Sequence, residues 1–488
     1  MEYIYVVLTL FQLCSLYNPI ESRRLDDYWS LNDRSFNLSL TTKIYDPKGR
    51  SKDNYGRSVA LAGNYALVGS PEYDEDDDQD DSGRVLLYEF NAGAWEIIRY
   101  MSDGIPGDYF GWCLDFHRSY TAVVGAWRDS TYGDFSGAIY LYDIETDKKK
   151  KQGNGTRLYA SDPKASAYFG YSVALGDYSG QEPQLVVGAY GSNYRGEAYI
   201  FRRDYSGNWY ELTRLAPTDG SMQDRFGWSV DIYMNHVAVG APLHKNNGAV
   251  YIYWFTDGSW ILGQKITQSF ASNTDDDVVY DFFGLSVATG DGVVVIGAPG
   301  NSIMGTEAGA IYVYVDSSYV HDNYPTIEEM KYSGRKLSDT INNVLYPFAS
   351  SSSSSTKALT SDQHQGLQRA QRKLDNMDEY TFLQVLAAPD SIAYSRFGWF
   401  VDYDGFRRRV IAGTDTTKLK TSGSATLYRF GTDKYFNLEY HFTPRDESGN
   451  IMYGISCAVN DDMVIVGAAR GTGRAMYSGS AYIYMAQS

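Results

Sequence analysis

This chain of 488 residues has few cysteines, more acidic than basic residues, and few long apolar runs. Its three cysteines, Cys14, Cys113 and Cys457, are too few for a disulfide framework, and we expect the last two to be buried free thiols. A formal net charge of −17 argues against nucleic acid or an acidic membrane surface as a partner. Beyond the N-terminal segment, no apolar run approaches the roughly 20 residues that a transmembrane helix needs.

Sequence signatures of catalysis are also scarce. The six histidines show no metal-ligand spacing, and the chain contains no Gly-x-Ser-x-Gly elbow, phosphate-binding loop or sialidase box. We therefore expect a protein that is not an enzyme and that requires no cofactor.

The N-terminal segment holds one apolar run, Tyr3–Leu13, of the length found in the core of a signal peptide. We predict that residues 1–22 are a signal peptide and residues 23–36 a linker, which makes the mature chain secreted or associated with the cell surface, with no membrane span. In a secreted protein the sequons at Asn37 and Asn154 are candidate glycosylation sites.

Tyrosine and glycine are abundant, with 44 and 47 copies, and both recur with a period. An aromatic-Gly pair returns seven times, and its successive glycines lie 55, 59, 57, 57, 114 and 56 residues apart. In each copy a second glycine ends the next apolar run, a third opens another, and an aromatic residue stands five positions past the third. The pairs are Tyr55-Gly56, Phe110-Gly111, Phe169-Gly170, Phe226-Gly227, Phe283-Gly284, Phe397-Gly398 and Tyr453-Gly454.

Each copy contains four short β-type runs, which is the pattern of one propeller blade. A single small sheet cannot bury both faces, whereas sheets arranged radially cover one another. We therefore predict an all-β fold, a seven-bladed β-propeller of four-stranded blades over residues 37–488. The run Asn37–Tyr45 alternates polar and apolar residues, and we predict that this N-terminal strand pairs with the last blade and closes the ring.

The one interval of 114 residues contains no further copy of the motif. Its segment Asp316–Glu379 is rich in Ser, Asp, Lys and Arg. We predict that residues 316–379 are a low-complexity, largely disordered insertion between the third and fourth strands of blade five.

Two other recurring features have structural interpretations. An Asp stands eight residues before six of the seven glycines, and we expect its carboxylate to shape a turn by accepting backbone N–H bonds. Paired tyrosines of the third strands, such as Tyr251 and Tyr253, share one face of a strand. We expect them to pack between blades and not to form a platform for stacking sugars.

These motifs resemble FG-GAP repeats, the units of the seven-bladed β-propeller at the head of integrin α-subunits. The FG element is clearest in Phe226-Gly227 and Phe283-Gly284, and the GAP element in Gly240-Ala241-Pro242 and Gly297-Ala298-Pro299. The resemblance implies a binding or adhesion module that presents the loops of one propeller face to an extracellular protein ligand. A carbohydrate-binding, lectin-like propeller is the alternative. A hydrolase would need three carboxylates that converge at the central channel.

The same resemblance implies where metal would bind. Loops of the form Asp-x-Asn/Asp-x-Asp-Gly between the first two strands bind Ca²⁺ in the family, and most of these loops are too short here. The longest, Gly176–Gln184, places Asp177, Ser179 and Gln181 at alternate positions and is the candidate Ca²⁺ loop. Asp402-Tyr403-Asp404-Gly405 is a weaker match, so we do not expect Ca²⁺ to be required.

The resemblance also implies a ligand face, formed by the loops between second and third strands and the loops that join successive blades. By position, the expected contact residues are Trp127, Arg128, Tyr132, Tyr190, Tyr194, Arg195, His244, Arg470 and Arg474. In blade one the equivalent loop, Asp74–Asp81, holds seven carboxylates in eight residues. Such a loop is either simply solvated or attracts cations or a basic partner.

Overall fold

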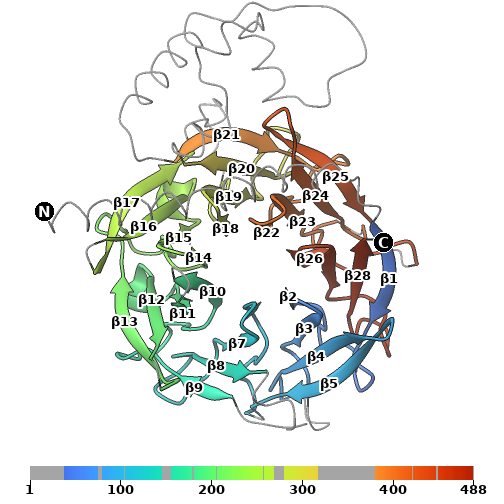
Figure 1. Cartoon of the computed structure of the whole chain (residues 1–488), viewed down its shortest axis with the longest axis horizontal. Helices are drawn as coiled ribbons and strands as arrows, with labels where there is room; N and C mark the ends of the chain where they lie inside the picture. Colours follow the sequence, from blue (N-terminus) through green and yellow to red (C-terminus); the bar gives the residue numbers. More distant parts are fainter. Residues whose placement is uncertain are drawn as a thin grey trace, which may run out of the picture.

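The computed structural model is a ring of seven four-stranded antiparallel sheets around a central channel (Figure 1). The predicted fold class and blade count are confirmed. The first strand of each blade lines the channel, and the fourth strand lies at the outer rim. The structure describes residues 38–74, 80–103, 105–144, 155–178, 181–204, 206–256, 258–268, 280–316, 380–419, 421–446 and 449–486.

The strands follow one another from the channel outward in every blade. Blade one is β2 (Ser58–Ala62), β3 (Tyr65–Ser70), β4 (Arg84–Asn91) and β5 (Ala94–Met101), and blade two is β6 (Leu114–Phe116), β7 (Thr121–Ala126), β8 (Ala138–Asp143) and β9 (Thr156–Leu158). Blade three is β10 (Ser172–Tyr178), β11 (Gln181–Ala189), β12 (Glu197–Arg203) and β13 (Trp209–Leu215), and blade four is β14 (Ser229–Tyr233), β15 (His236–Ala241), β16 (Ala249–Thr256) and β17 (Ser259–Thr267). Blade five is β18 (Ser286–Gly290), β19 (Val293–Ala298), β20 (Ala310–Val315) and β21 (Thr381–Leu386), and blade six is β22 (Phe400–Asp404), β23 (Arg409–Gly413), β24 (Ala425–Phe430) and β25 (Phe436–Phe442). Blade seven is β26 (Tyr453–Asn460), β27 (Met463–Ala468), β28 (Ser480–Ala486) and β1 (Leu38–Ile44).

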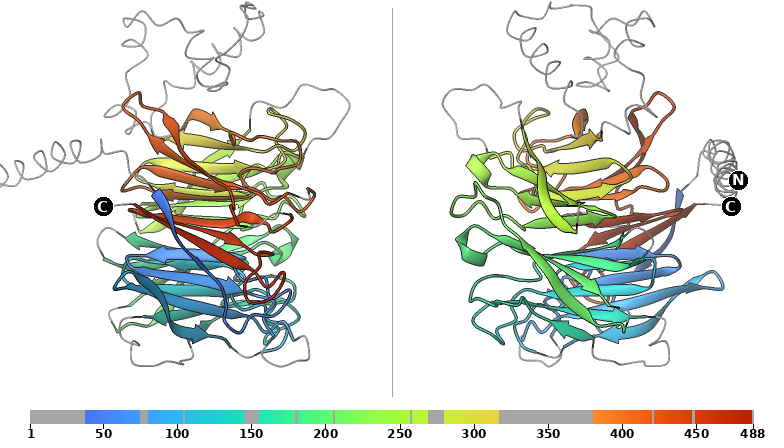
Figure 2. Two further views of the ribbon diagram at one scale, coloured as in Figure 1. Left: turned by 90° about the vertical axis from the view of Figure 1, so that its right-hand side faces the viewer. Right: turned by 60° about the vertical axis from the view of Figure 1, so that its left-hand side comes forward.

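The two ends of the described chain close the ring as predicted. Strand β1 pairs antiparallel with β28, from Leu38 opposite Ala486 to Ile44 opposite Ala481. The two strands lie side by side at the right of Figure 1 and at the front of the left view in Figure 2. An ion pair between Lys43 and Asp446, 2.8 Å long, adds a second link between β1 and blade seven.

Blade five contains the predicted insertion point. Val315 of β20 lies opposite Thr381 of β21, so the third and fourth strands pair although more than 60 residues separate them in sequence. The insertion itself, the predicted signal peptide and the predicted linker lie outside the described residues, so their predicted properties stay predictions.

Phe226 and Gly227 show why the aromatic-Gly pair recurs. The Phe226 ring is fully buried between blades three and four, and it packs edge-on against Tyr251 and Tyr253 at centroid distances of 5.3 and 6.2 Å. Gly227 has a φ of +84°, and a Cβ at this position would lie 2.3 Å from the carbonyl oxygen of Glu197. The paired tyrosines are therefore core residues between blades, as the sequence predicted.

The recurrent Asp has the predicted role at Asp103, whose Oδ1 accepts the backbone N–H of Ile105 at 3.1 Å, and a different role in other copies. Asp219 accepts a hydrogen bond from the Tyr251 hydroxyl at 2.9 Å and pairs with Lys265 of the fourth strand. Tyr199–Asp162 and Tyr482–Asp446 repeat the bond, each at 3.0 Å. The carboxylate thus ties a third-strand tyrosine and a fourth-strand cation together, because both side chains reach the same blade end.

A ring of side-chain hydrogen bonds joins neighbouring blades near the channel. Two residues after the glycine of the motif, a serine hydroxyl donates to the carbonyl of the corresponding glycine in the next blade. The bonds run from Ser58 to Gly111 (2.7 Å), Ser172 to Gly227 (3.0 Å), Ser229 to Gly284 (2.8 Å), Ser286 to Gly398 (2.9 Å) and Ser456 to Gly56 (2.9 Å). Blade six breaks the pattern with Phe400.

Cys113 takes the serine position in blade two, and its thiol donates to the carbonyl of Gly170 at 3.1 Å. Burial raises the pKa of Cys113 to about 12, so the thiol stays neutral. Cys113 and Cys457 are both free, Cys457 being fully buried, which confirms the prediction of free thiols for the described cysteines.

Candidate functional site

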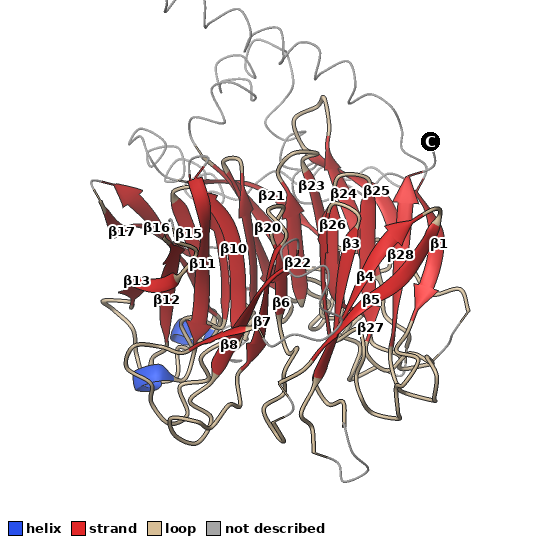
Figure 3. Ribbon diagram, turned by 60° about the horizontal axis from the view of Figure 1, so that its bottom comes forward, coloured by secondary structure: helices blue, strands red, loops and turns tan. Residues whose placement is uncertain are grey.

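The first strands of all seven blades line a central cavity of about 1610 Å³. At one end the cavity narrows to a neck of about 170 Å³. The neck opens on the upper face, which we define as the side with the loops between second and third strands and the loops between blades. The two short 3₁₀ helices, η1 (Ser192–Tyr194) and η2 (His244–Asn246), belong to this face (Figure 3).

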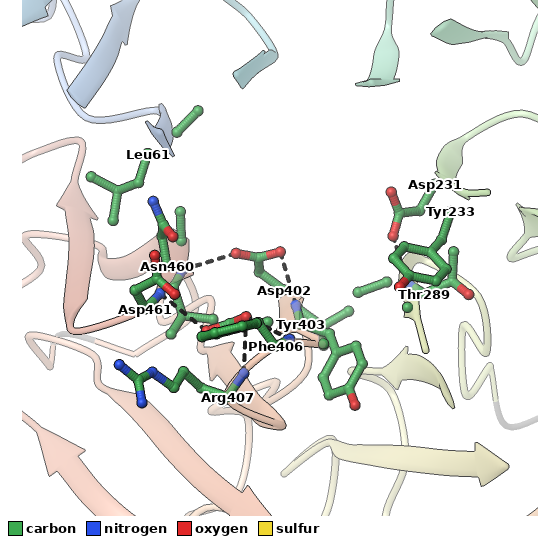
Figure 4. A pocket seen from close by; sticks show the side chains of 18 of the residues that line it. Leu61, Asp231, Tyr233, Thr289, Asp402, Tyr403, Phe406, Arg407, Asn460 and Asp461 are labelled. Atoms are coloured by element: carbon green, nitrogen blue, oxygen red, sulfur yellow. Dashed lines mark hydrogen bonds between the residues drawn. The ribbon is translucent and has the colours of Figure 1, made fainter. Parts of the chain in front are cut away.

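Three aspartates project from first strands into the channel wall, in alternate blades. Four residues after the glycine of the motif stand Asp115, Asp231 and Asp402 in blades two, four and six, whereas the other four blades have Ala. Figure 4 shows Asp231 and Asp402 on two separate first strands that border the channel. The sequence analysis did not notice this alternation, although aligning the seven copies would have displayed it.

Each of these carboxylates joins its blade to the next one. Asp402 accepts the backbone N–H of Tyr403 at 2.8 Å through Oδ1 and that of Val459 in blade seven at 2.8 Å through Oδ2. Asp115 binds the N–H groups of Phe116 and Leu175 in the same way, at 2.7 and 2.6 Å. Asp231 binds those of Ile232 and Thr289. A first strand is the inner edge of its sheet, so its channel-facing N–H groups need such acceptors.

Burial and mutual repulsion make these carboxyl groups weaker acids. Burial raises the pKa of Asp115 and of Asp402 to about 6, and it raises the pKa of Asp231 too. The charge of Asp115 raises the pKa of both Asp231 and Asp402 further, and Asp402 also acts on Asp231. Three carboxylates thus do converge on the channel, but every oxygen already accepts a backbone N–H bond. The arrangement serves the pairing of blades.

The opposite, wide mouth of the channel holds the candidate Ca²⁺ loop. Asp177 is paired there with Arg118 and with His117, whose Nε2 lies 2.9 Å from the carboxylate. Ser179 and the side chain of Gln181 lie outside the described residues. Among the residues that the structure does describe, no group of three or more His, Cys, Asp or Glu side chains could hold a metal ion. Ca²⁺ binding by the loop stays a prediction.

The weaker candidate, Asp402-Tyr403-Asp404-Gly405, uses its carboxylates for backbone contacts. Asp404 accepts the N–H groups of Phe406 at 2.9 Å and Asp461 at 3.0 Å. Figure 4 shows Phe406 and Arg407 beside them.

The neck is a ring of seven side chains, each directly after the glycine of its motif. Six are aromatic or aliphatic and one is a cation. In chain order they are Arg57, Trp112, Tyr171, Trp228, Leu285, Trp399 and Ile455. These positions face the channel because they begin the innermost strands. Their residue types vary from blade to blade, so a search for repeated residues does not find them.

On blades two to four the ring continues outward into an aromatic cluster. Its members are Tyr109, Trp112, Trp127, Phe135, Tyr168, Tyr171, Tyr190 and Trp228, in contact through centroid distances of 4.6–6.5 Å. Tyr171, Tyr190 and Trp228 form the tightest group, at 4.6–4.8 Å. The Nε1–H of Trp127 is buried without a hydrogen-bond partner within the described part of the chain.

Three arginines lie against this cluster. The guanidinium of Arg57 is 4.2 Å from the Trp112 ring centroid, that of Arg128 is 4.0 Å from Tyr109, and that of Arg225 is 4.9 Å from Trp228. Across the described ranges, none of the three guanidinium groups makes a hydrogen bond or an ion pair. At the wide mouth, by contrast, arginines are paired: Arg118 with Asp177 and Arg409 with Glu439.

Eight of the nine predicted contact residues lie on the upper face, in two groups. Trp127, Arg128 and Tyr190 belong to the aromatic cluster and its arginines. Tyr132, Tyr194, Arg195, Arg470 and Arg474 are exposed elsewhere on the upper face, with 56% and 74% of Tyr132 and Tyr194 accessible. Arg57, Trp112, Tyr171, Arg225 and Trp228 were missed. Aligning the seven copies and asking which positions vary would have found the ring residues.

His244 does not lie on the surface, contrary to our expectation. Its side chain is 1% accessible, its Nδ1 lies 2.7 Å from Asp224, and its Nε2 accepts from Lys265 at 2.6 Å. The short loop folds into η2 and turns the imidazole inward, which sequence position alone did not reveal.

The other predicted sites are only partly within the described residues. Asn37 and Asn154 both fall outside them. In the acidic loop of blade one, Asp81 accepts a hydrogen bond from the Tyr109 hydroxyl at 3.2 Å, which brings this end of the loop to the aromatic cluster.

The fold and the site define a closed, seven-bladed β-propeller with an aromatic upper mouth. The model of the FG-GAP repeat matches residues 38–88, 100–142, 153–201, 209–253, 271–314 and 436–484, more than half of the chain. The chain therefore belongs to the FG-GAP repeat family. A comparison with curated proteins found no match. In the described residues, no helix is long and apolar enough to cross a membrane.

Proposed function

We propose that the chain is a secreted or cell-surface binding module whose upper face takes a protein ligand. The observation that supports this most is the aromatic cluster with its three stacked, unpaired arginines. Aromatic and arginine side chains dominate the energetics of protein interfaces because they bury large areas at a low entropic cost. At the wide mouth of the channel, by contrast, Arg118 already has a carboxylate partner in Asp177.

We propose binding and not catalysis, with no required cofactor. The three carboxylates at the repeated first-strand position in the channel wall, Asp115, Asp231 and Asp402, have their oxygens occupied by backbone N–H groups. A general acid or base must instead reach its substrate by a hydrogen bond.

Site-specific photo-cross-linking tests the choice of face. A photoreactive amino acid replaces Tyr132 or Tyr194 on the upper face, and in a matched control it replaces Phe406, which is 54% exposed at the wide mouth. Each labelled chain is mixed with extracellular proteins of the source organism and then irradiated. We expect one discrete adduct from the upper-face positions and none from position 406. An adduct from position 406 alone contradicts the proposal.

A carbohydrate ligand is the second candidate. Tyr132 is 56% exposed and packs edge-on against Tyr159 at 4.6 Å, a kind of aromatic surface on which a sugar ring stacks. Binding on a glycan array that is lost in Tyr132→Ala, without any protein adduct, would favour it.

A further inference from the structure

We propose that the neck of the channel binds the carboxylate side chain of an acidic segment of the protein partner, with Arg57 as its counter-charge. The inference rests on the proposed function, since it names the chemistry that the upper face recognises. The starting observation is that six of the seven ring residues are apolar or aromatic, and the seventh is Arg57.

Arg57 lacks a compensating charge at contact distance. Burial in the neck lowers the pKa of its guanidinium, because a low-dielectric surrounding disfavours the charged form. Two carboxylates, Glu72 and Asp415, act on it through space. Asp415 is paired with Arg396 at 3.2 Å, and Glu72 is hydrogen-bonded to Asn54. A desolvated cation without a partner is unfavourable, and an incoming anion removes that penalty.

The way in which Arg57 is held leaves it ready for a carboxylate. Its guanidinium lies over the face of Trp112, so stacking fixes the plane while the N–H donors at the edge stay available. Arg128 and Arg225 are stacked in the same manner farther out, and the Nε–H of Arg128 is buried without a partner among the described residues. A second and a third carboxylate of the same acidic segment would pair with Arg128 and Arg225.

Both positive and negative side chains surround the neck, so an acidic ligand is attracted to Arg57 only at short range. Asp81 and Glu72 both act on Arg128, and the whole chain carries a net charge of −17. Long-range steering therefore does not favour an anionic partner. Recognition must come from contact between carboxylate and guanidinium in the neck, where screening by salt is weak.

The lining of the neck favours an acidic peptide over an acidic sugar. Leu285, Ile455 and the tryptophans offer apolar surface to the methylene groups of a Glu side chain. The hydroxyls of Ser58, Ser172, Ser229 and Ser286 nearby already donate to glycine carbonyls. Sugar hydroxyls entering the neck would find few partners, and a buried hydroxyl without one is unfavourable.

Intrinsic tryptophan fluorescence of the full chain tests the proposal, because Trp112, Trp228 and Trp399 line the neck. The probes are hexaglutamate, hexaglutamine and hexagalacturonate. We expect saturable binding of hexaglutamate, none of hexaglutamine, and at least tenfold weaker binding of hexagalacturonate. Failure of hexaglutamate to bind overturns the proposal, and tighter binding of hexagalacturonate overturns the choice of a peptide.

Substitution of Arg57 assigns the effect to the neck. Leu285 occupies the equivalent position in blade five, so the fold should tolerate Arg57→Leu. We expect this variant to bind hexaglutamate at least tenfold more weakly. Arg57→Lys keeps the charge and should retain part of the affinity. Arg118→Gln removes an arginine at the wide mouth and should leave the affinity unchanged. Equal binding by wild type and Arg57→Leu, with unchanged melting temperatures, contradicts the proposal.

Different experimental results contradict the proposed function and this inference. A protein adduct from Tyr132 or Tyr194 that persists in Arg57→Leu leaves the upper face as the binding face and removes the carboxylate pocket. An adduct from position 406 alone removes both.

Discussion

The guanidinium of Arg57 lies 4.2 Å from the ring centroid of Trp112, across the boundary between blades one and two. Both residues follow the glycine of their motif, so the same position supplies a cation in one blade and an aromatic surface in the next. The seven ring residues differ in type, and Arg57 is the one that introduces a charge. Binding of one particular partner needs such a departure, because a symmetric ring presents seven equivalent contacts.

The bond between Asp402 and the Val459 N–H gives a first prediction about stability. Asp402→Ala leaves two backbone N–H groups without their acceptor, and we expect a loss of about 2 kcal/mol in the free energy of unfolding. Alanine fits sterically, since Ala60, Ala174, Ala288 and Ala458 occupy the same position in other blades. Urea denaturation measures the change. A loss below about 0.5 kcal/mol would mean that water in the channel replaces the carboxylate.

A second prediction concerns pH. The folded-state pKa of Asp402 is about 6, above its ordinary value of 3.8, so the folded state binds the proton more tightly than the unfolded state. The resulting stabilisation is fully present below the unfolded value and is lost as pH rises through about 6. We expect the urea midpoint of the wild type to fall over this window by more than that of Asp402→Asn. Parallel pH profiles would show that Asp402 does not titrate there.

Two glycines test the packing between blades. A Cβ at Gly240 would lie 2.0 Å from the Gly284 carbonyl oxygen of blade five, so Gly240→Ala should destabilise the fold by about 3 kcal/mol. The matched control is Gly258→Ala, whose φ of +79° is unfavourable for alanine but whose Cβ would meet no atom within 4 Å. We expect about 1 kcal/mol for the control. Equal losses, measured by thermal unfolding, would refute the packing explanation.

Calcium dependence gives a fourth prediction. The carboxylate of Asp177 is paired with Arg118, which supplies positive charge where a cation would otherwise be needed. Nε2 of His117 lies 2.9 Å from the same carboxylate, but burial lowers the pKa of His117 to about 4, so the imidazole adds no charge near neutral pH. Calorimetry should therefore show the same melting temperature with millimolar Ca²⁺ and with a chelator. A large rise in melting temperature with Ca²⁺ would indicate that the loop around Asp177 binds the metal.

Much of the scaffold was predictable because its requirements repeat. Gly227 needs a positive φ and has no room for a Cβ, and the same geometry recurs in every blade, so the glycines appear in the sequence as a period. The pairing of β1 with β28 was predictable because one strand was missing at one end and one was left over at the other.

The candidate site was harder to predict because it depends on positions that vary. Arg57, Trp112 and Trp228 share a place in the motif but not a residue type, and a search for recurrence passes over them. His244 was misplaced because the loop before it turns inward as η2, a conformation that depends on contacts with Asp224 and Lys265 from other loops and strands. The role of Asp162, Asp219 and Asp446 was misassigned for a related reason: the partner of each, a tyrosine hydroxyl, lies about 30 to 40 residues away in sequence.

The most direct test of the account compares two variants for binding to the partner recovered by cross-linking. Trp127→Ala combined with Arg128→Gln alters the aromatic cluster, whereas Phe406→Ala alters the wide mouth, and the melting temperature of each variant checks that it is folded. The equilibrium dissociation constant for that partner is the quantity to measure. The account predicts at least a tenfold increase for the upper-face variant and no change for Phe406→Ala; the reverse order would contradict it.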